Sequence, residues 1–167
     1  MRIHTIFMTC AIILFLQACD TQSSKKVTFK SGFEMTIPQN WEVKKSTHLG
    51  AKSGDLDLTI PDANLKIKFG VFDVAKMSAE DVRKVAKKEV DSFSQDNMAQ
   101  STKIAGKMPL VSYEVVKIYG DVEVVMNLIV VEATQQTMLV SIRGLKKDRD
   151  KYRGDIKKMI AGISYQK

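Results

Sequence analysis

Residues 122–133, VEVVMNLIVVEA, constrain the fold of this chain more than any other stretch. Successive residues of a strand point to opposite sides of its sheet, so as a strand this stretch has two apolar faces. One face carries Val122, Val124, Met126, Leu128 and Val130, and the other carries Val125, Ile129 and Val131. Both faces have to be covered, and we therefore expect a central strand with a layer on each side of the sheet.

Shorter stretches in which apolar and polar residues alternate lie on both sides of this strand in the sequence. We predict further strands near residues 27–29, 33–37, 41–43, 56–60, 65–74, 98–104, 110–119 and 138–142. Gly120-Asp121 has the residue types of a two-residue hairpin turn, which would pair residues 110–119 with residues 122–133. After a turn at residues 38–40, Trp41 should begin the return strand of the first hairpin and pack that hairpin against the sheet.

Two stretches repeat apolar residues at helical spacing. The first follows Ser78, which can cap a helix together with Asp81 three places later. The second is predicted as one helix over residues 148–163. Their apolar stripes are Val82, Val85, Ala86, Val90 and Phe93 in the first, and Tyr152, Ile156, Met159, Ile160 and Ile163 in the second. Together with the strands, these helices indicate an α+β domain, which we expect to be a three-layer α-β-α sandwich on a mainly antiparallel sheet.

The N-terminus has the pattern of a secretory signal. Arg2 precedes an almost unbroken apolar run at residues 6–16, which is shorter than the about 20 residues of a spanning helix. The run leads into Leu16-Gln17-Ala18-Cys19, which resembles the lipobox of bacterial lipoproteins. The resemblance implies a diacylglyceryl group on the Cys19 sulfur and cleavage between Ala18 and Cys19. It also implies a further acyl chain, such as palmitate, on the new amino terminus.

Polar residues 20–26 follow the cysteine and should form a tether. The chain would then consist of a signal peptide (1–18), a lipidated cysteine with its tether (19–26) and a folded domain (27–167). The lipid would hold the domain on the periplasmic side of the bacterial cell envelope. Asp20 resembles a signal for retention in the inner membrane of enteric bacteria, which favours that membrane over the outer membrane.

The start of the expected domain resembles a known family. Gly32-Phe33, Ile37-Pro38 and Trp41 follow one another, and the chain ends with an aliphatic stretch before Ser164-Tyr165. These residues and the order of elements resemble the PsbP-like fold and, within it, the DcrB-like bacterial lipoproteins. Proteins of this fold include photosystem accessory subunits, a nuclear-import factor that binds a small GTPase, and chaperones for secreted toxins. The resemblance therefore implies a binding module, and it supplies no active-site motif.

Few catalytic or metal-binding chemistries are open to such a chain. After cleavage before Cys19, that residue is the only cysteine and His48 is the only histidine. Cys–His nucleophile pairs and zinc sites built from cysteines or several histidines are then excluded. Asp55, Asp57 and Asp62 lack the glycine and the distal glutamate of an EF-hand loop, so we interpret them as a solvated strand face. We expect no enzyme, no catalytic residue, no metal and no cofactor.

Positive charge is concentrated at the C-terminus. Cleavage before Cys19 leaves 149 residues with a net charge of +6, of which +5 lies in residues 146–167. The candidate contact residues for a membrane or a partner are Lys147, Arg149, Lys151, Arg153, Lys157 and Lys158. Outside the cytoplasm the fitting partners are an anionic membrane surface or an acidic protein, and not nucleic acid. The simpler alternative is the solvated outer face of a helix.

These patterns predict a membrane-anchored periplasmic lipoprotein that acts as a non-catalytic binding or accessory module of the cell envelope, with a protein partner there. One alternative is a periplasmic immunity lipoprotein that neutralises a delivered toxin. Another is an enzyme that uses carboxylates or a lone serine. A toxin gene immediately upstream would favour immunity, whereas an operon for a transporter or for the envelope would favour the accessory role.

Overall fold

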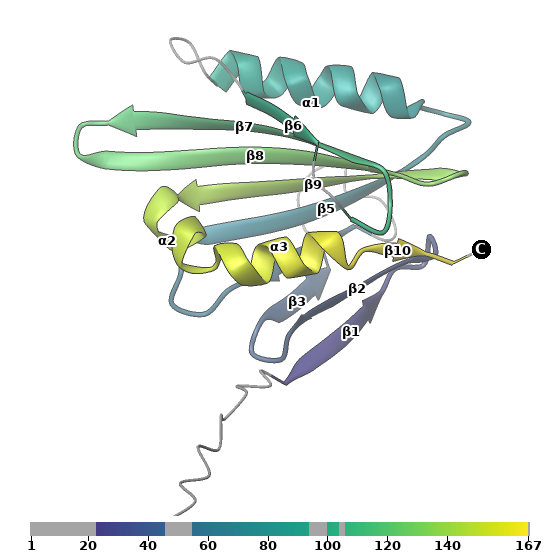
Figure 1. Cartoon of the computed structure of the whole chain (residues 1–167), viewed down its shortest axis with the longest axis horizontal. Coiled ribbons are helices and arrows are strands. Elements are labelled where there is room, and N and C mark those ends of the chain that lie inside the picture. Colours follow the sequence, from purple (N-terminus) through teal and green to yellow (C-terminus); the bar gives the residue numbers. More distant parts are fainter. Residues whose placement is uncertain (1–22, 46–54, 94–99, 104–105, 167) are drawn as a thin grey trace, which may run out of the picture.

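The computed structural model describes residues 23–45, 55–93, 100–103 and 106–166. These residues form ten strands and three helices (Figure 1). The strands are β1 (Ser24–Thr28), β2 (Phe33–Pro38), β3 (Glu42–Lys45), β4 (Leu56–Thr59), β5 (Leu65–Asp73), β6 (Gln100–Lys103), β7 (Leu110–Tyr119), β8 (Val122–Glu132), β9 (Gln136–Leu145) and β10 (Ser164–Tyr165). The helices are α1 (Ala79–Phe93), α2 (Lys146–Lys151) and α3 (Arg153–Ala161). None of the described helices is long and apolar enough to cross a membrane.

The larger sheet has seven strands in the order β3-β4-β5-β9-β8-β7-β6, and every neighbouring pair is antiparallel. β8 lies in its interior, paired with β7 from Val122 to Val131 and with β9 from Val124 to Glu132. The prediction of a central strand at residues 122–133 is therefore confirmed. The Gly120-Asp121 turn joins β7 to β8, as its residue types predict.

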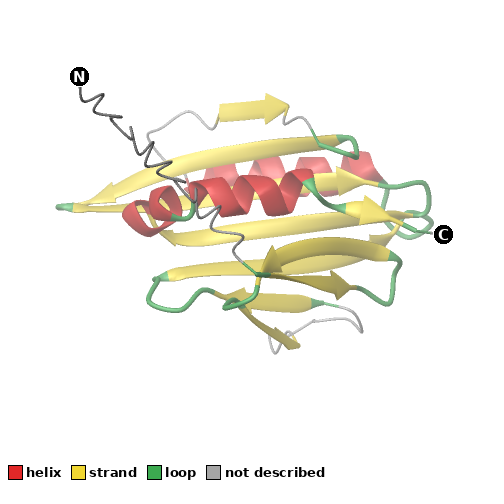
Figure 2. Cartoon of the chain, turned by 60° about the horizontal axis from the view of Figure 1, so that its bottom comes forward, coloured by secondary structure: helices red, strands yellow, loops and turns green. Residues whose placement is uncertain are grey.

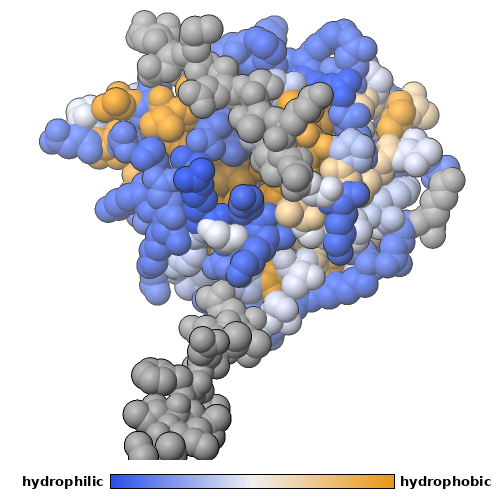
Figure 3. All heavy atoms as spheres, in the orientation of Figure 1, coloured by the Kyte–Doolittle hydropathy of each residue, from blue (hydrophilic) through white to orange (hydrophobic). Residues whose placement is uncertain are grey.

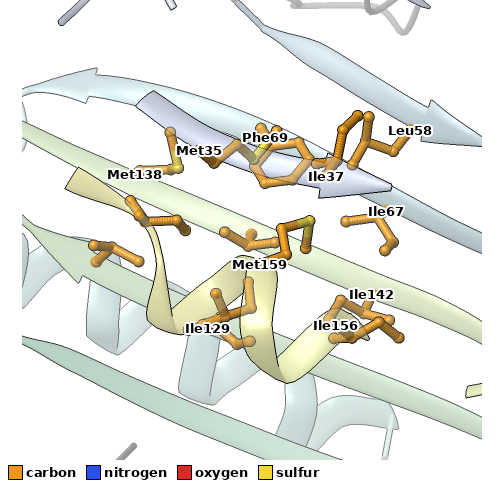
Figure 4. Packing of buried hydrophobic residues seen from close by; sticks show 14 of the residues in the cluster. Met35, Ile37, Leu58, Ile67, Phe69, Ile129, Met138, Ile142, Ile156 and Met159 are labelled. Atoms are coloured by element: carbon orange, nitrogen blue, oxygen red, sulfur yellow. The ribbon is translucent and has the colours of Figure 1, made fainter. Parts of the chain in front are cut away.

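Both faces of this sheet are covered, which confirms the three-layer α-β-α arrangement. Figure 2 shows the α2–α3 pair in front of the sheet and α1 behind it. On the α1 side, Met126, Leu128 and Val130 of β8 pack with Val82, Ala86 and Val90 of the helix. On the other side, Ile129 and Val131 belong to a larger cluster that also contains residues of α3 and β2. In Figure 4 the labelled side chains of β2, α3 and the sheet point toward one another.

A second sheet, which the sequence does not predict, has three strands in the order β1-β2-β10. The C-terminal strand pairs with β2 through Tyr165 opposite Phe33. The chain passes so close to Gly32 that a Cβ atom there would lie 2.4 Å from the carbonyl oxygen of Gln166. Gly32 also has a φ of +95°, so both space and backbone conformation require glycine at this position.

Two boundaries near the N-terminus differ from the prediction. β1 begins at Ser24, so the last three residues of the expected tether belong to a strand. β3 is not the return strand of the first hairpin, because it pairs with β4 in the larger sheet. Trp41, directly before β3, is buried in the core beside Tyr152, with ring centroids 6.3 Å apart. Trp41 is thus a core residue, as expected, but the hairpin that it was expected to hold against the sheet does not form.

The predicted single C-terminal helix is two helices, with the break at Tyr152. The backbone of Tyr152 leaves helical geometry with φ −99° and ψ 11°, and Gly154, a weak helix former, follows. The Tyr152 hydroxyl donates a hydrogen bond to the carbonyl oxygen of Pro61 at 3.3 Å. α3 buries Ile156, Met159 and Ile160, whereas α2 buries no residue. The break thus separates a helix packed in the core from one that lies on the surface.

α1 begins at the predicted cap. The Ser78 hydroxyl donates a hydrogen bond to Asp81 Oδ2 at 2.6 Å, and the Asp81 amide donates one to Ser78 Oγ at 3.2 Å. The hydrogen bond from Ser78, followed by the charge of Lys84, lowers the pKa of Asp81. Because the charged form is the favoured one, this pair stabilises the folded protein at neutral pH and loses its contribution as the pH falls through the lowered pKa.

We expect Ser78→Ala to lower the free energy of unfolding by about 0.5–2 kcal/mol, the usual effect of removing a helix cap. The pKa of Asp81 should rise at the same time, which an NMR titration of the carboxyl group measures. Ser92→Ala is the matched control, because Ser92 lies in the last turn of α1 and donates only to the carbonyl oxygen of Glu89. An equal loss of stability in both variants would contradict the capping role of Ser78.

Candidate docking surface

Five of the six predicted contact residues are exposed on α2 and α3. They are Lys147, Lys151, Arg153, Lys157 and Lys158, which we call the exposed C-terminal cations. Within the described parts of the chain none of the five forms an ion pair, although Lys151 Nζ lies 5.0 Å from the ring centroid of Tyr152. Their charges are therefore available to a partner outside the domain.

Arg149, the sixth residue, lies differently. Its side chain is only 13% exposed, and its Nη1 is 2.8 Å from Glu114 Oε2 on β7. The same carboxylate accepts a hydrogen bond from Asn127 Nδ2 at 3.0 Å, and Asn127 Oδ1 accepts one from the Ser112 hydroxyl at 2.8 Å. Arg149 thus ends a polar chain across the sheet face. It fastens α2, which has no buried apolar residue, to β7 and β8.

A second ion-pair group ties α2 to the start of β8. Lys146 Nζ lies 2.9 Å from Asp150 Oδ2 on its own helix and 3.5 Å from Glu123 Oε2 on β8. The hydrogen bond with Asp150 raises the pKa of Lys146, and the hydrogen bond with Lys146 lowers the pKa of Asp150. α2 is therefore held beside the turn between β7 and β8.

This turn projects beyond the larger sheet. The pairing of β8 with β9 begins only at Val124, opposite Leu145, so residues 118–123 form a two-stranded ribbon. We call residues 118–122 the hairpin tip. Ile118, Tyr119 and Val122 are 63%, 51% and 47% exposed, which makes the tip the largest group of exposed apolar side chains near one another in the described chain. The turn between β7 and β8 is at the left of Figure 1, and Figure 3 shows apolar surface at that end of the molecule, beside the hydrophilic surface over α2.

The tip corrects one expectation from the sequence. Val122 was predicted to lie on a covered face of the central strand, but it lies beyond the layers that cover the rest of β8. Periodicity shows which side of a strand a residue faces, and does not show how far the neighbouring strand extends. The exposure of the tip could be predicted from the sequence only if the length of β9 relative to β8 were known.

The acidic residues near β4 also differ from expectation. Asp55 is 8% exposed and accepts a hydrogen bond from the Val71 amide at 3.3 Å, so it is not part of a solvated face. Asp57 is half-buried, whereas Asp62 is exposed in the turn before β5 with a φ of +57°. The described residues contain no group of three acidic, histidine or cysteine side chains placed to hold a metal ion.

The residues that carry the predictions for the N-terminus and for the lone histidine lie outside the described ranges. Ala18, Cys19 and Asp20 precede the first described residue, and His48 falls between the described ranges 23–45 and 55–93. The lipidation site, the cleavage site and the absence of histidine chemistry therefore stay predictions.

No protein-family model and no curated protein sequence matches this chain. Solved structures match its fold. CyanoP, the cyanobacterial PsbP of Synechocystis sp. PCC 6803, aligns with a TM-score of 0.56 and 12% identity, over 89% of this chain and 96% of its own. LpqN of Mycobacterium tuberculosis, described as involved in cell envelope biogenesis, aligns with a TM-score of 0.56 and 8% identity, over 87% and 91%.

A structure from Bacteroides thetaiotaomicron VPI-5482 aligns with a TM-score of 0.56 and 15% identity. It matches 87% of this chain, which spans about half (49%) of the length of that protein. At such identities the likeness concerns the fold. The domain has an α+β, PsbP-like fold, as its sequence predicts.

Proposed function

We propose that this protein is a lipid-anchored, non-catalytic binding or accessory module of the bacterial cell envelope, with its docking surface turned toward anionic lipid. The envelope assignment is supported by the lipobox-like Leu16-Gln17-Ala18-Cys19 and by the shared fold of LpqN, a protein described as involved in cell envelope biogenesis. The PsbP-like fold supports a binding role, because a fold can be shared while the function lies in the surface that each protein presents.

One observation carries the membrane orientation: exposed cations lie on the helices beside an exposed apolar tip. Each basic residue near an anionic bilayer is worth about 1 kcal/mol, so several acting together orient a domain that its lipid already anchors. Ile118 supplies the apolar part on this side, because it lies opposite Glu123, which forms an ion pair with Lys146 of α2. Tyr119 and Val122 point to the other face of the ribbon, the side of α1. The same surface offers both the electrostatic and the apolar part of such a contact.

The length of the tether agrees with this arrangement. β1 begins at Ser24, five residues after Cys19, and an extended chain of that length spans about 18 Å. A tether of this length keeps the domain close to the lipid headgroups, so α2 and the hairpin tip can contact them. Within a Debye length of about 8 Å at physiological salt, the cations would act on the membrane directly.

The test uses unlipidated protein, residues 23–167, and vesicles that contain phosphatidylglycerol. Binding should fall with added salt and should be lost in the triple variant Lys147→Glu, Lys151→Glu and Lys158→Glu, as measured by co-sedimentation. The matched control is Lys45→Glu, Lys76→Glu and Lys88→Glu, because these exposed lysines lie away from α2 and α3 and also form no ion pair in the described chain. Both variants have the same net charge, so only a local role of the C-terminal cations separates them.

A second arm tests the tip. Ile118→Ser should weaken binding at high salt, where the electrostatic part is screened, whereas Val122→Ser, on the opposite face of the ribbon, is the matched control. Wild-type protein that ignores anionic vesicles even at low salt would contradict the membrane orientation. Equal loss of binding in the two charge-reversal variants would reduce the contact to a general effect of net charge.

A further inference from the structure

The α1 side of the larger sheet is covered unevenly. α1 packs mainly on β7 and β8 and less on β9, and the same face of β5 has no helix of the described chain over it. A groove with a volume of about 470 Å³ lies there beside α1, over β5 and β9. This volume falls within the range of about 300–1,000 Å³ that is typical of sites for small molecules.

The floor of the groove is apolar. It is formed by Phe72 of β5, Leu128 of β8 and Leu139 of β9, which belong to the cluster on the α1 side. Gly70 keeps the middle open, because a Cβ atom there would have no neighbour closer than 3.6 Å, the edge of the Phe72 ring. The floor thus provides apolar surface and space in one place.

The rim of the groove is basic. Lys66 and Lys68 of β5 and Arg143 of β9 lie on the same face, with Lys66 directly opposite Arg143 in the strand register. Like charges in directly opposite positions destabilise a sheet. Arg143 is neutralised by an ion pair with Glu89 of α1, but Lys66 and Lys68 form no ion pair with any described residue.

The acidic groups nearby offset only part of this charge, and none of them stands opposite Lys66. Asp55, at the end of the groove, accepts the hydrogen bond from the Val71 amide. Asp57 of β4 stands opposite Lys68 in the register without an ion pair between them. Two ammonium groups therefore stand at the edge of an apolar floor. This combination fits a ligand that has an apolar body and an anionic end.

We infer that this groove binds a single-chain anionic amphiphile, whose acyl chain lies on the floor and whose carboxylate or phosphate is held by Lys66 and Lys68. The inference goes beyond the proposed function, because the groove lies on the opposite side of the sheet from α2 and α3. Two sources share this chemistry, a free fatty acid and a lysophospholipid. Either one would be a cargo or a signal that the accessory module receives.

The test measures binding by isothermal titration calorimetry to the chain from residue 19 onward, with Cys19→Ser to keep it free of lipid. The probes are laurate and lysophosphatidylglycerol, each below its critical micelle concentration, and dodecyl maltoside as a neutral probe with the same chain length as laurate. Laurate or the lysolipid should bind at least tenfold more tightly than the maltoside. The tighter of the two anions identifies the source.

Two variants assign the binding to the groove. Lys66→Ala with Lys68→Ala should weaken binding of the anionic probes at least tenfold, whereas Lys76→Ala with Lys88→Ala should leave it unchanged. Gly70→Val fills the floor and should abolish binding of all probes, and a thermal melt checks that this variant is folded. No binding of either anion to folded wild-type protein would overturn the inference. So would an affinity for the maltoside equal to that for the tighter of the two anions, or unchanged affinity in the lysine variant.

Discussion

Replacing Ile129 with alanine is expected to lower the free energy of unfolding by about 2–5 kcal/mol. Ile129 is 2% exposed on the central strand β8, in the cluster that α3 and β2 cover (Figure 4). The truncation removes apolar contacts and leaves a cavity among Ile142, Ile156 and Met159, which belong to rigid elements and cannot close around it fully. Urea denaturation followed by circular dichroism measures the change.

The hairpin that contains Ile129 also supplies the control. Ile118→Ala removes the same atoms from β7, but Ile118 is 63% exposed at the hairpin tip, so its loss should change stability by no more than about 0.5 kcal/mol. Similar effects of the two substitutions would mean that burial does not distinguish these positions. A change below about 0.5 kcal/mol for Ile129→Ala would contradict the packing of β8 between two layers.

Cys19→Ser is expected to abolish lipid attachment completely. The proposed diacylglyceryl group is joined through the cysteine sulfur, which a serine hydroxyl does not provide. Each buried methylene contributes about 0.8 kcal/mol to membrane binding, so two or three long chains hold a protein in the bilayer effectively permanently. Metabolic labelling with a fatty acid should mark the wild-type protein alone, and the variant should appear as an uncleaved precursor or in the soluble fraction.

The signal itself contains the matched control for this experiment. Cys10→Ser removes the other cysteine of the chain, which lies within residues 1–18, and should leave labelling and membrane retention unchanged. Equal labelling of wild-type protein and Cys19→Ser would refute the lipoprotein assignment. Labelling that is lost in both variants would instead point to a damaged signal peptide.

The layers of the domain could be predicted because they depend on local patterns. Residues 122–133 have two apolar faces, and β8 accordingly lies between α1 on one side and α3 with β2 on the other. The cap at Ser78 was also predictable, since hydroxyl and carboxylate three residues apart suffice to form it. Such features involve residues that are near one another in the sequence.

The pairing of distant strands could not be predicted in this way. β3 (Glu42–Lys45) has a single apolar residue, Val43, and all four of its side chains are exposed, so its sequence does not show that it joins β4. β10 has two residues, too few for a periodic pattern, and pairs with β2 about 130 positions away. Alternation specifies which side of a strand is buried, and leaves its partner open.

The candidate surface was predictable in part for the same reason. Composition identified the C-terminal cations, and five of the six are exposed. The exception, Arg149, has its partner Glu114 on a strand 35 residues earlier, so no local pattern separates it from the others. The groove at Lys66 and Lys68 was missed because it depends on which strands α1 leaves uncovered.

The small sheet also determines when folding can be completed. Its middle strand, β2, is made early in synthesis, but β10 consists of Ser164–Tyr165, near the end of the chain. Without β10 and the packing of β2 on α3, β1 and β2 are an isolated hairpin, which is marginally stable in water. The small sheet is therefore complete only when two segments about 130 residues apart in the sequence have paired, so its formation depends on the closure of nearly the whole described chain.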